Sequence, residues 1–297
     1  MTLTGDVVQN DSTNSFSNSR VLAVAPPALW PIASIVFTQI GVALSVPMTA
    51  HLSGGAVAGL RLTWAALILL LIARPSAASL SGAYLKRVLS LGIATGGMAI
   101  CYFEAVARLP IAIVTTIEFC GPLGVALVTS RSIKDLICAF VAIAGIACFA
   151  SGNSHAHDIA GFALAFAAAG CWSVYILLTR SVATRTNGIE GLSLSLSVAS
   201  LVSLCISIAP QWNHVTFVDL VQTAGIALLF PLIPYAIEMS TLRRLNARTF
   251  GILMSLEPAI SGVIAWLVLE QRLSLLQLAG VVLVSTASIG TCVERKS

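Results

Sequence analysis

The chain has 297 residues, of which 57% are hydrophobic and 9% are charged, and its formal net charge is +4. So apolar a composition leaves too little polar surface for a water-soluble domain, and it predicts a polytopic membrane protein. The small positive charge is explained by Lys and Arg held in cytoplasmic loops, so no nucleic-acid partner is expected.

Apolar stretches follow one another along most of the chain, and each is about as long as a spanning helix, which needs ~20 residues. Residues 1–27 instead contain many Asn, Ser and Thr and predict a disordered cytoplasmic tail. The rest predicts an all-α integral membrane protein with ten transmembrane helices, at 28–48, 54–73, 88–107, 110–129, 135–152, 159–179, 188–209, 217–241, 247–269 and 275–293.

The distribution of Lys and Arg predicts how the chain lies in the membrane. If the N-terminus is cytoplasmic, thirteen of these residues fall in inside segments, and two, Arg108 and Arg272, fall in outside loops. Positive residues are concentrated in cytoplasmic loops of membrane proteins. We therefore predict a multi-pass protein of the cytoplasmic (inner) membrane with both termini in the cytoplasm.

The two halves of the chain share short similarities at a nearly constant spacing. Pro122 corresponds to Pro258, 136 residues later, and Gly145 corresponds to Gly280, 135 residues later. These matches predict two five-helix repeats, at 28–152 and 159–293. Because five is odd, the second repeat enters the membrane from the opposite side, as in many secondary transporters whose substrate lies between inverted repeats.

Two opposite charges are predicted at matched depth in the membrane. Arg61 in the second span and Glu118 in the fourth both lie roughly 10–12 Å below the outer ends of their helices, at ~1.5 Å per residue. Isolated charges at that depth are costly, so we expect the two side chains to pair. The pair could bind substrate and couple its transport, or it could be a purely structural ion pair.

Glu257 lies near the middle of the ninth span, directly before Pro258. Proline removes a backbone donor and favours a kink or local unwinding. A carboxyl group beside such a break could take a proton or face a substrate ammonium group. The alternative is a protonated Glu that is hydrogen-bonded to a neighbouring helix.

Glu238 and Glu104 lie near the helix ends, at the inner end of the eighth span and the outer end of the third. Both positions would suit gates or latches that pair with Arg residues in loops. Both would equally suit interfacial carboxylates with no part in transport. Trp172, in the sixth span, is expected either to face a cavity or to pack against neighbouring helices.

The sequence predicts neither a cofactor nor a metal. No Walker-type glycine loop is present, and no Ser/His/Asp arrangement points to an enzyme. His155 and His157 precede Asp158 in one short outside loop, where solvated side chains are more common than a metal site.

Several segments resemble the threonine/homoserine exporter (RhtA-like) group of the drug/metabolite transporter superfamily, whose repeat is the EamA domain. The resemblance covers nearly all of 28–293, and the most specific segment is Ala247 to Pro258. Further similar segments are Gly59 to Leu62, Ile117 to Pro122, Ala169 to Tyr175, which includes Trp172, and Pro234 to Met239, which includes Tyr235 and Glu238.

This resemblance implies two inverted five-helix repeats and proton-linked export of small amino acids, with threonine or homoserine expected as substrate. Arg61 would bind the substrate carboxylate, and Glu118 or Glu257 would face the ammonium group or carry the proton. The expected partners are a small-molecule substrate, protons and the lipid bilayer, and a homodimer is left open. Two alternatives are a carrier for another solute, such as an amine, purine or organic acid, and a non-transporting membrane scaffold.

Overall fold

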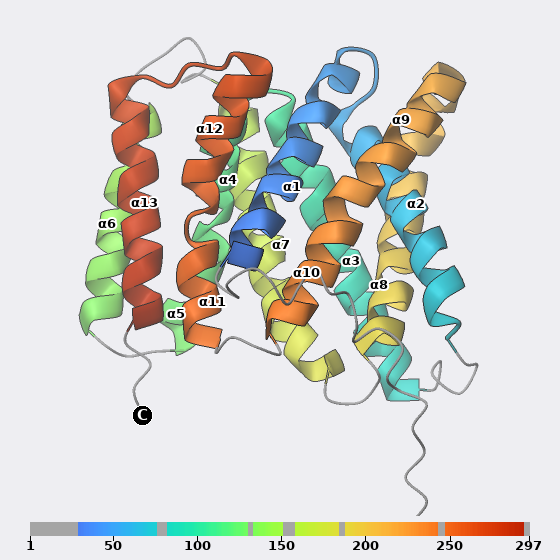
Figure 1. Cartoon of the computed structure of the whole chain (residues 1–297), viewed down its shortest axis with the longest axis horizontal. Coiled ribbons are helices and arrows are strands. Elements are labelled where there is room, and N and C mark those ends of the chain that lie inside the picture. The colour runs from blue at the N-terminus through green and yellow to red at the C-terminus, as the bar shows by residue number, and fades with distance from the viewer. Residues whose placement is uncertain are drawn as a thin grey trace, which may run out of the picture.

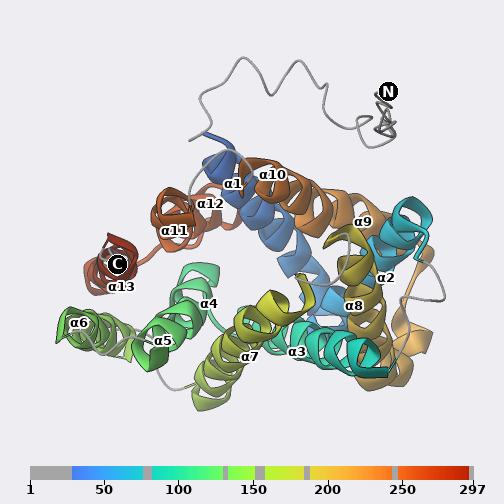
Figure 2. The same ribbon diagram turned by 90° about the horizontal axis from the view of Figure 1, so that it is seen from below.

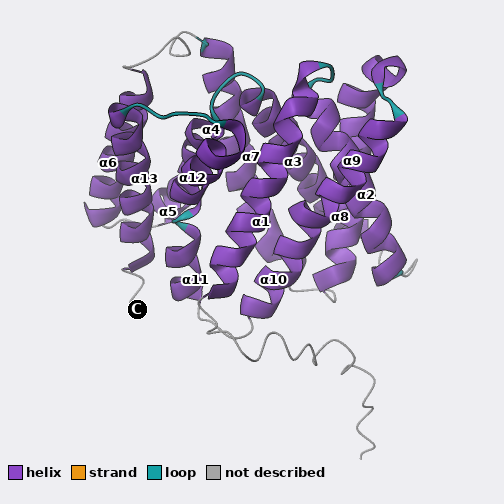
Figure 3. Ribbon diagram, turned by 45° about the horizontal axis from the view of Figure 1, so that its top comes forward, coloured by secondary structure: helices purple, strands orange, loops and turns teal. Residues whose placement is uncertain are grey.

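The computed structural model describes residues 29–75, 82–129, 133–150, 158–183, 188–242 and 247–293. Every regular element in these segments is helical, as Figure 3 shows, and no strand occurs in them. Helices satisfy their backbone hydrogen bonds within one segment, which an apolar environment requires. The predicted tail at 1–27 lies outside the described residues.

The first half of the chain contains seven helical elements. They are α1 (Leu29–Ser45), the 3₁₀ helix η2 (Val46–Ala50), α2 (Gly54–Ala73), α3 (Gly82–Val106), α4 (Ile111–Glu118), α5 (Cys120–Thr129) and α6 (Ile133–Ala150).

The second half continues the same pattern from residue 159. Its elements are α7 (Ile159–Ala183), α8 (Gly188–Ser203), η4 (Leu204–Ile208), η5 (Ala209–His214), α9 (Phe217–Ala227), η6 (Leu228–Leu232), α10 (Ile233–Leu242), α11 (Ala247–Met254), α12 (Glu257–Leu269) and α13 (Leu275–Val293).

Within the described segments, seven helices are long and apolar enough to cross a membrane, and three further apolar helices are shorter. Large apolar side chains point outward from them: Leu71 is 74% exposed and Phe140 is 64% exposed. Such an exterior would be insoluble in water and suits lipid. The chain is therefore an all-helical integral membrane protein.

Three of the predicted spans are interrupted. The fourth divides into α4 and α5 at Phe119, and the ninth divides into α11 and α12, with the break predicted beside Pro258 in place. The eighth is interrupted at Phe230, whose φ of −152° and ψ of 113° are not helical. Pro231 follows directly, and a proline inside a helix removes a backbone donor.

The helices form an elongated bundle (Figures 1 and 2). At one edge α6 lies beside α13, while α2, α8 and α9 occupy the opposite edge. Between them stand α1, α3, α4, α7, α10 and α12. The middle of the bundle is therefore enclosed by helices from both halves of the chain.

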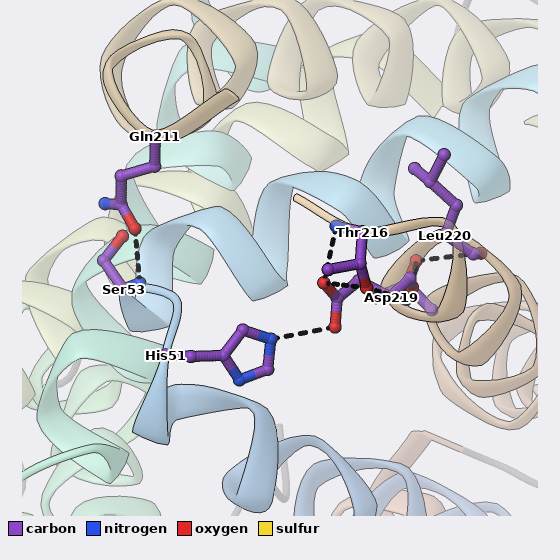
Figure 4. A network of polar contacts seen from close by, with 7 residues as sticks. His51, Ser53, Gln211, Thr216, Asp219 and Leu220 are labelled. Atoms are coloured by element: carbon purple, nitrogen blue, oxygen red, sulfur yellow. Dashed lines mark hydrogen bonds and ion pairs between the residues drawn. The ribbon is translucent and has the colours of Figure 1, made fainter. Parts of the chain in front are cut away.

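A polar cluster joins the two halves at the upper end of the bundle in Figure 1, and Figure 4 shows it closely. His51, after η2, lies 2.9 Å from the carboxylate of Asp219 on α9. The same carboxylate accepts a hydrogen bond from the backbone of Thr216, whose hydroxyl caps α9 in return. Nearby, the backbone N–H of Ser53 donates to Gln211 at 2.8 Å. These contacts hold the α1–α2 connection against the α8–α9 connection.

Small residues allow the closest helix contacts. A Cβ atom added at Gly92 would meet Val198 and would lie 2.6 Å from the carbonyl oxygen of Ser195, both on α8. No atom lies within 4 Å of the corresponding position at Gly170 on α7. Gly92 is therefore required by the packing of α3 on α8, whereas Gly170 is not.

We predict opposite effects of alanine at these two helical glycines. Gly92→Ala should destabilise the protein by about 1–3 kcal/mol, because the added methyl group overlaps α8. Gly170→Ala should stabilise it by roughly 0.5–1 kcal/mol, because alanine is the better helix former. The measurement is the thermal unfolding midpoint of each variant purified in detergent. Equal midpoints for the two variants would contradict this packing.

Candidate functional site

A cavity of about 240 Å³ lies in the middle of the bundle. At ~30 Å³ per water-sized group, it can hold a solute of at least about eight non-hydrogen atoms, the size of threonine or homoserine. It is lined from both halves of the chain, by Thr38, Gln39, Val42, Arg61, Leu62, Thr95, Met98, Ala99, Tyr102, Phe103, Glu118, Trp172, Tyr175, Leu192, Ser195, Leu196, Phe230, Pro231, Pro234, Tyr235, Glu238, Met254 and Glu257.

Seven of the eight candidate residues named from the sequence line this cavity. They come from five helices: Arg61 on α2, Glu118 on α4, Trp172 and Tyr175 on α7, Tyr235 and Glu238 on α10, and Glu257 on α12. Glu104 does not line it.

Arg61 is 2% exposed and is held between two aromatic rings. Its guanidinium carbon lies 4.1 Å from the ring centre of Phe103 and 4.7 Å from that of Phe230. Two of its nitrogens, Nε and Nη1, are buried without a hydrogen-bond partner. Cation–π contact stabilises the charge but leaves its N–H donors unused. The guanidinium therefore keeps donors for an anionic group.

The expected ion pair between Arg61 and Glu118 is absent. Both residues are described, and neither forms an ion pair within 4.0 Å, unlike His51 with Asp219 and Arg108 with Asp158. The expectation rested on matched depth, which fixes a residue's height along its helix but not the direction of its side chain. Both residues line the same cavity, and the guanidinium faces aromatic rings instead.

Two carboxyl groups of the cavity lie at helix breaks. Glu118 is the last residue of α4 and Glu257 is the first of α12, and the two are close enough to repel each other when charged. Glu257 accepts a hydrogen bond of 3.1 Å from the side-chain amide of Gln39 on α1. The phenol of Tyr102 is within electrostatic range of both carboxyl groups and of Arg61.

The third carboxyl group, Glu238, lies nearer the lower end of the bundle in Figure 1, on α10. It accepts a hydrogen bond of 2.8 Å from the hydroxyl of Ser34 on α1, so it joins the two halves. The phenols of Tyr175 and Tyr235 lie close to each other and to Glu238. This group is well placed for a contact that changes when α10 moves relative to α1.

Trp172 meets both expectations held for it. It lines the cavity, and it also packs edge-to-face against Phe119, with ring centres 5.1 Å apart. Phe119 is the residue at which α4 ends and α5 begins. The indole thus forms part of the cavity wall and supports the break in the fourth span.

Glu104 has a different environment from the other candidates. Its carboxylate accepts a hydrogen bond of 2.8 Å from the backbone N–H of Gly55, in the first turn of α2. The first N–H groups of a helix have no partner within the helix, and a nearby carboxylate satisfies them. It forms no ion pair with an Arg among the described residues. Tyr102, two residues before Glu104 on α3, lines the cavity, whereas Glu104 does not.

Sequence reasoning did not select four residues that shape the site, namely Gln39, Tyr102, Phe103 and Phe230. Tyr102 shares a hydrogen bond of 2.9 Å with Thr115, which also accepts one of 3.2 Å from Ser261. Gln39 is the one that a sequence signal could have found, because a buried amide inside an apolar helix needs partners from other helices. The aromatic residues carry no such signal.

The described residues contain no group of three or more potential metal ligands. His155 and His157 lie outside them. Asp158 accepts a hydrogen bond of 2.9 Å from the backbone of Gly161 and lies 3.9 Å from Arg108.

An apolar exterior, helical regular structure throughout the described residues and an internal cavity lined by Arg61 and three carboxyl side chains define a multi-pass membrane protein with a solute-sized internal site. Comparison with known proteins identifies its family. Residues 159–292 match the EamA-like transporter family. The threonine/homoserine exporter RhtA of Salmonella typhimurium (strain SL1344) is 30% identical over 277 residues, which cover 92% of this chain and 94% of the relative. RhtA of Escherichia coli (strain K12) is 28% identical over 275 residues, which cover 92% and 93%.

The chain therefore belongs to the EamA family of the drug/metabolite transporter superfamily, in its RhtA-like group. It is a membrane transporter of the inner membrane and not an enzyme. A solved crystal structure with 17% identity has a TM-score of 0.61 and covers 91% of this chain and 99% of that chain, which extends the similarity to the fold.

The role of Glu104 can be tested by separating its charge from its hydrogen bond. Glu104→Ala leaves the Gly55 N–H without its acceptor and should destabilise the protein by about 1–3 kcal/mol. Glu104→Gln keeps an acceptor oxygen and should unfold near the wild-type temperature. The measurement is the thermal midpoint in detergent. A Gln variant as damaged as the Ala variant would show that the charge itself is needed, as a gate would require.

Proposed function

We propose that this protein is a secondary transporter that exports small amino acids such as threonine and homoserine, coupled to proton entry. The observation that carries the proposal is the cavity, which is lined both by a buried Arg61 with unpaired N–H donors and by the carboxyl side chains of Glu118, Glu238 and Glu257. An amino acid supplies both complementary charges. The names of the RhtA relatives support this class of substrate.

Arg61 would bind the substrate carboxylate. Hydrogen bonds between a guanidinium and a carboxylate are charge-assisted and roughly twice as strong as neutral ones. In the present conformation Phe230 covers part of the guanidinium, and it lies at the non-helical break before α10. A shift of this break would change the contact between the Phe230 ring and the guanidinium, so binding at Arg61 would be linked to movement of α10.

Glu118 and Glu257 would carry the proton or hold the substrate ammonium group. Burial favours the neutral form of a carboxyl group, whereas a nearby cation favours the charged form. A proton and an ammonium group would therefore compete for the same pair of side chains. Such competition is what antiport requires, because the site releases one cation when it takes the other.

The proposed architecture is ten spans in two inverted five-helix repeats, at 28–152 and 159–293, with both termini in the cytoplasm. The packing supports it, because exchanging the halves converts several helix contacts into one another: α3 packs on α7 as α10 packs on α1. In addition, α2 packs on α8, its counterpart in the second half, and α6 packs on its counterpart α13. The breaks after α4 and after α11 fall at corresponding places, and the excess of Lys and Arg in inside segments supports the orientation.

The cavity wall favours one alternative, a carrier for an aromatic amine. Six aromatic side chains line the cavity: Tyr102, Phe103, Trp172, Tyr175, Phe230 and Tyr235. Aromatic faces attract cations and stack on planar solutes. A substrate panel that includes aromatic amines separates this function from amino-acid export.

The test is uptake of labelled threonine and homoserine into inverted membrane vesicles, with and without an imposed pH gradient. Wild-type vesicles should accumulate both substrates only with the gradient. Arg61→Ala should reduce uptake about 10- to 100-fold, the usual effect of losing a hydrogen bond to a charged group. Arg108→Ala is the matched control, because Arg108 does not line the cavity and its side chain is 46% exposed.

Glu118→Gln and Glu257→Gln should each weaken coupling to the gradient, with the exposed Glu270→Gln as control. If both cavity variants keep full gradient-driven uptake, the coupling mechanism is wrong. If the folded wild type takes up neither amino acid but does take up an aromatic amine, the alternative replaces the proposal. If no solute on the panel moves, a scaffold role would replace transport.

A further inference from the structure

Gln39 has an environment unlike that of any other neutral polar residue of the cavity wall. It lies within α1, where it is 1% exposed, and it lines the cavity beside Glu257. A primary amide has two donors and an acceptor oxygen, and each needs a partner when water is absent. The positions of these partners show what Gln39 offers to a ligand.

One end of the Gln39 amide is fixed by Glu257. The Nε2 atom donates to Oε1 of Glu257 at 3.1 Å, and a carboxylate can only accept, so the amide nitrogen must face it. The amide oxygen, Oε1, is buried without a hydrogen-bond partner. A buried acceptor without a donor is unfavourable, and native proteins leave few of them. The oxygen is therefore available for a donor that the protein itself does not supply.

The surrounding groups define the donor that fits. Glu257 is bonded to the same amide, and Glu118 is within electrostatic range of Glu257. Three neighbouring side chains thus present acceptor oxygens, two of them as carboxyl groups. An unsubstituted ammonium group has three N–H donors and a positive charge, which matches this arrangement in number and in sign.

We propose that Gln39 is a positioning and specificity residue that orients Glu257 and accepts a hydrogen bond from the substrate's primary ammonium group. The inference rests on the proposed function and names its substrate class more narrowly: zwitterions with an unsubstituted ammonium group. Each N-methyl group removes one donor and leaves one buried acceptor unpaired. Sites built to bind a polar group discriminate strongly against analogues that lack it.

A merely structural role makes a different prediction. If Gln39 only ties α1 to α12, its removal lowers stability and weakens all ligands equally. If its oxygen binds the ammonium group, its removal changes the ratio between ligands that differ only in N-methylation. The ratio is therefore the readout that separates the two roles.

The experiment is calorimetric titration of the full-length protein in detergent with threonine, N-methylthreonine and N,N-dimethylthreonine. Wild-type affinity should fall stepwise, about ten-fold for each donor removed. Gln39→Met, which keeps the length of the side chain, should bind threonine about ten-fold more weakly and should lose the roughly ten-fold preference for threonine over N-methylthreonine. Gln277→Met is the matched control, because Gln277 is also buried but accepts from the backbone of Ser274 at the start of α13.

Each outcome decides something. Equal binding of the three ligands by wild type overturns the inference without any variant, which covers the case in which Gln39→Met does not fold. A folded Gln39→Met protein that keeps the wild-type ratio also overturns it, while the proposed function stands because threonine still binds. If the folded wild type binds no threonine, the proposed function fails and the inference fails with it.

Discussion

A polar group surrounded by hydrocarbon finds no water, so its hydrogen bonds must be made inside the protein. The backbone meets this requirement by forming helices. Hydroxyl side chains meet it by donating to the carbonyl group one turn earlier, as Ser45, Thr63 and Thr95 do. Four charged side chains within the spans, Arg61, Glu118, Glu238 and Glu257, have no such local solution. They are gathered around one internal cavity, which is why the candidate site lies there.

Arg61 is the clearest example of a buried charge that is stabilised without an ion pair. Its charge is buried, yet it is stabilised by the faces of Phe103 and Phe230 and has no direct carboxylate partner. A guanidinium closely paired with Glu118 would have its donors occupied, and a substrate would have to displace that pair. Aromatic rings instead keep the cation in place while its N–H groups stay available. In the proposed mechanism, the break at Phe230 would connect occupancy of the site to the position of α10.

Much of the fold and of the candidate site follows from the sequence, and the remainder has a physical explanation. Buried charges are costly in a membrane, so the positions of Arg61, Glu118, Glu238 and Glu257 within apolar spans identify them as candidate site residues. All four line the cavity. Sequence does not give the rotation of one helix relative to another. For that reason it predicted an ion pair for Arg61 that is absent.

The same limitation affected residues that carry no charge or whose partner is backbone. Glu104 caps α2 through the N–H of Gly55, an interaction that depends on how α3 approaches α2. The roles of Gln39 and Phe230 depend on contacts between separate helices. Gln39 on α1 contacts Glu257 on α12, and Phe230 in η6 contacts Arg61 on α2. No spacing in the chain predicts such contacts, because they link separate helices, which are 49 residues apart for Glu104 and Gly55 and 218 apart for Gln39 and Glu257.

The pair formed by α6 and α13 has a consequence for how such a protein can diverge. The two helices pack closely on each other at one edge of the bundle, and neither supplies a residue to the cavity wall. Their side chains are thus under selection for assembly in the lipid, and those of the wall for recognition of the solute. Substitutions in the cavity wall can therefore change the transported solute while the α6–α13 edge stays constant. Substitutions at this edge can adapt the protein to a membrane of different composition without changing the solute.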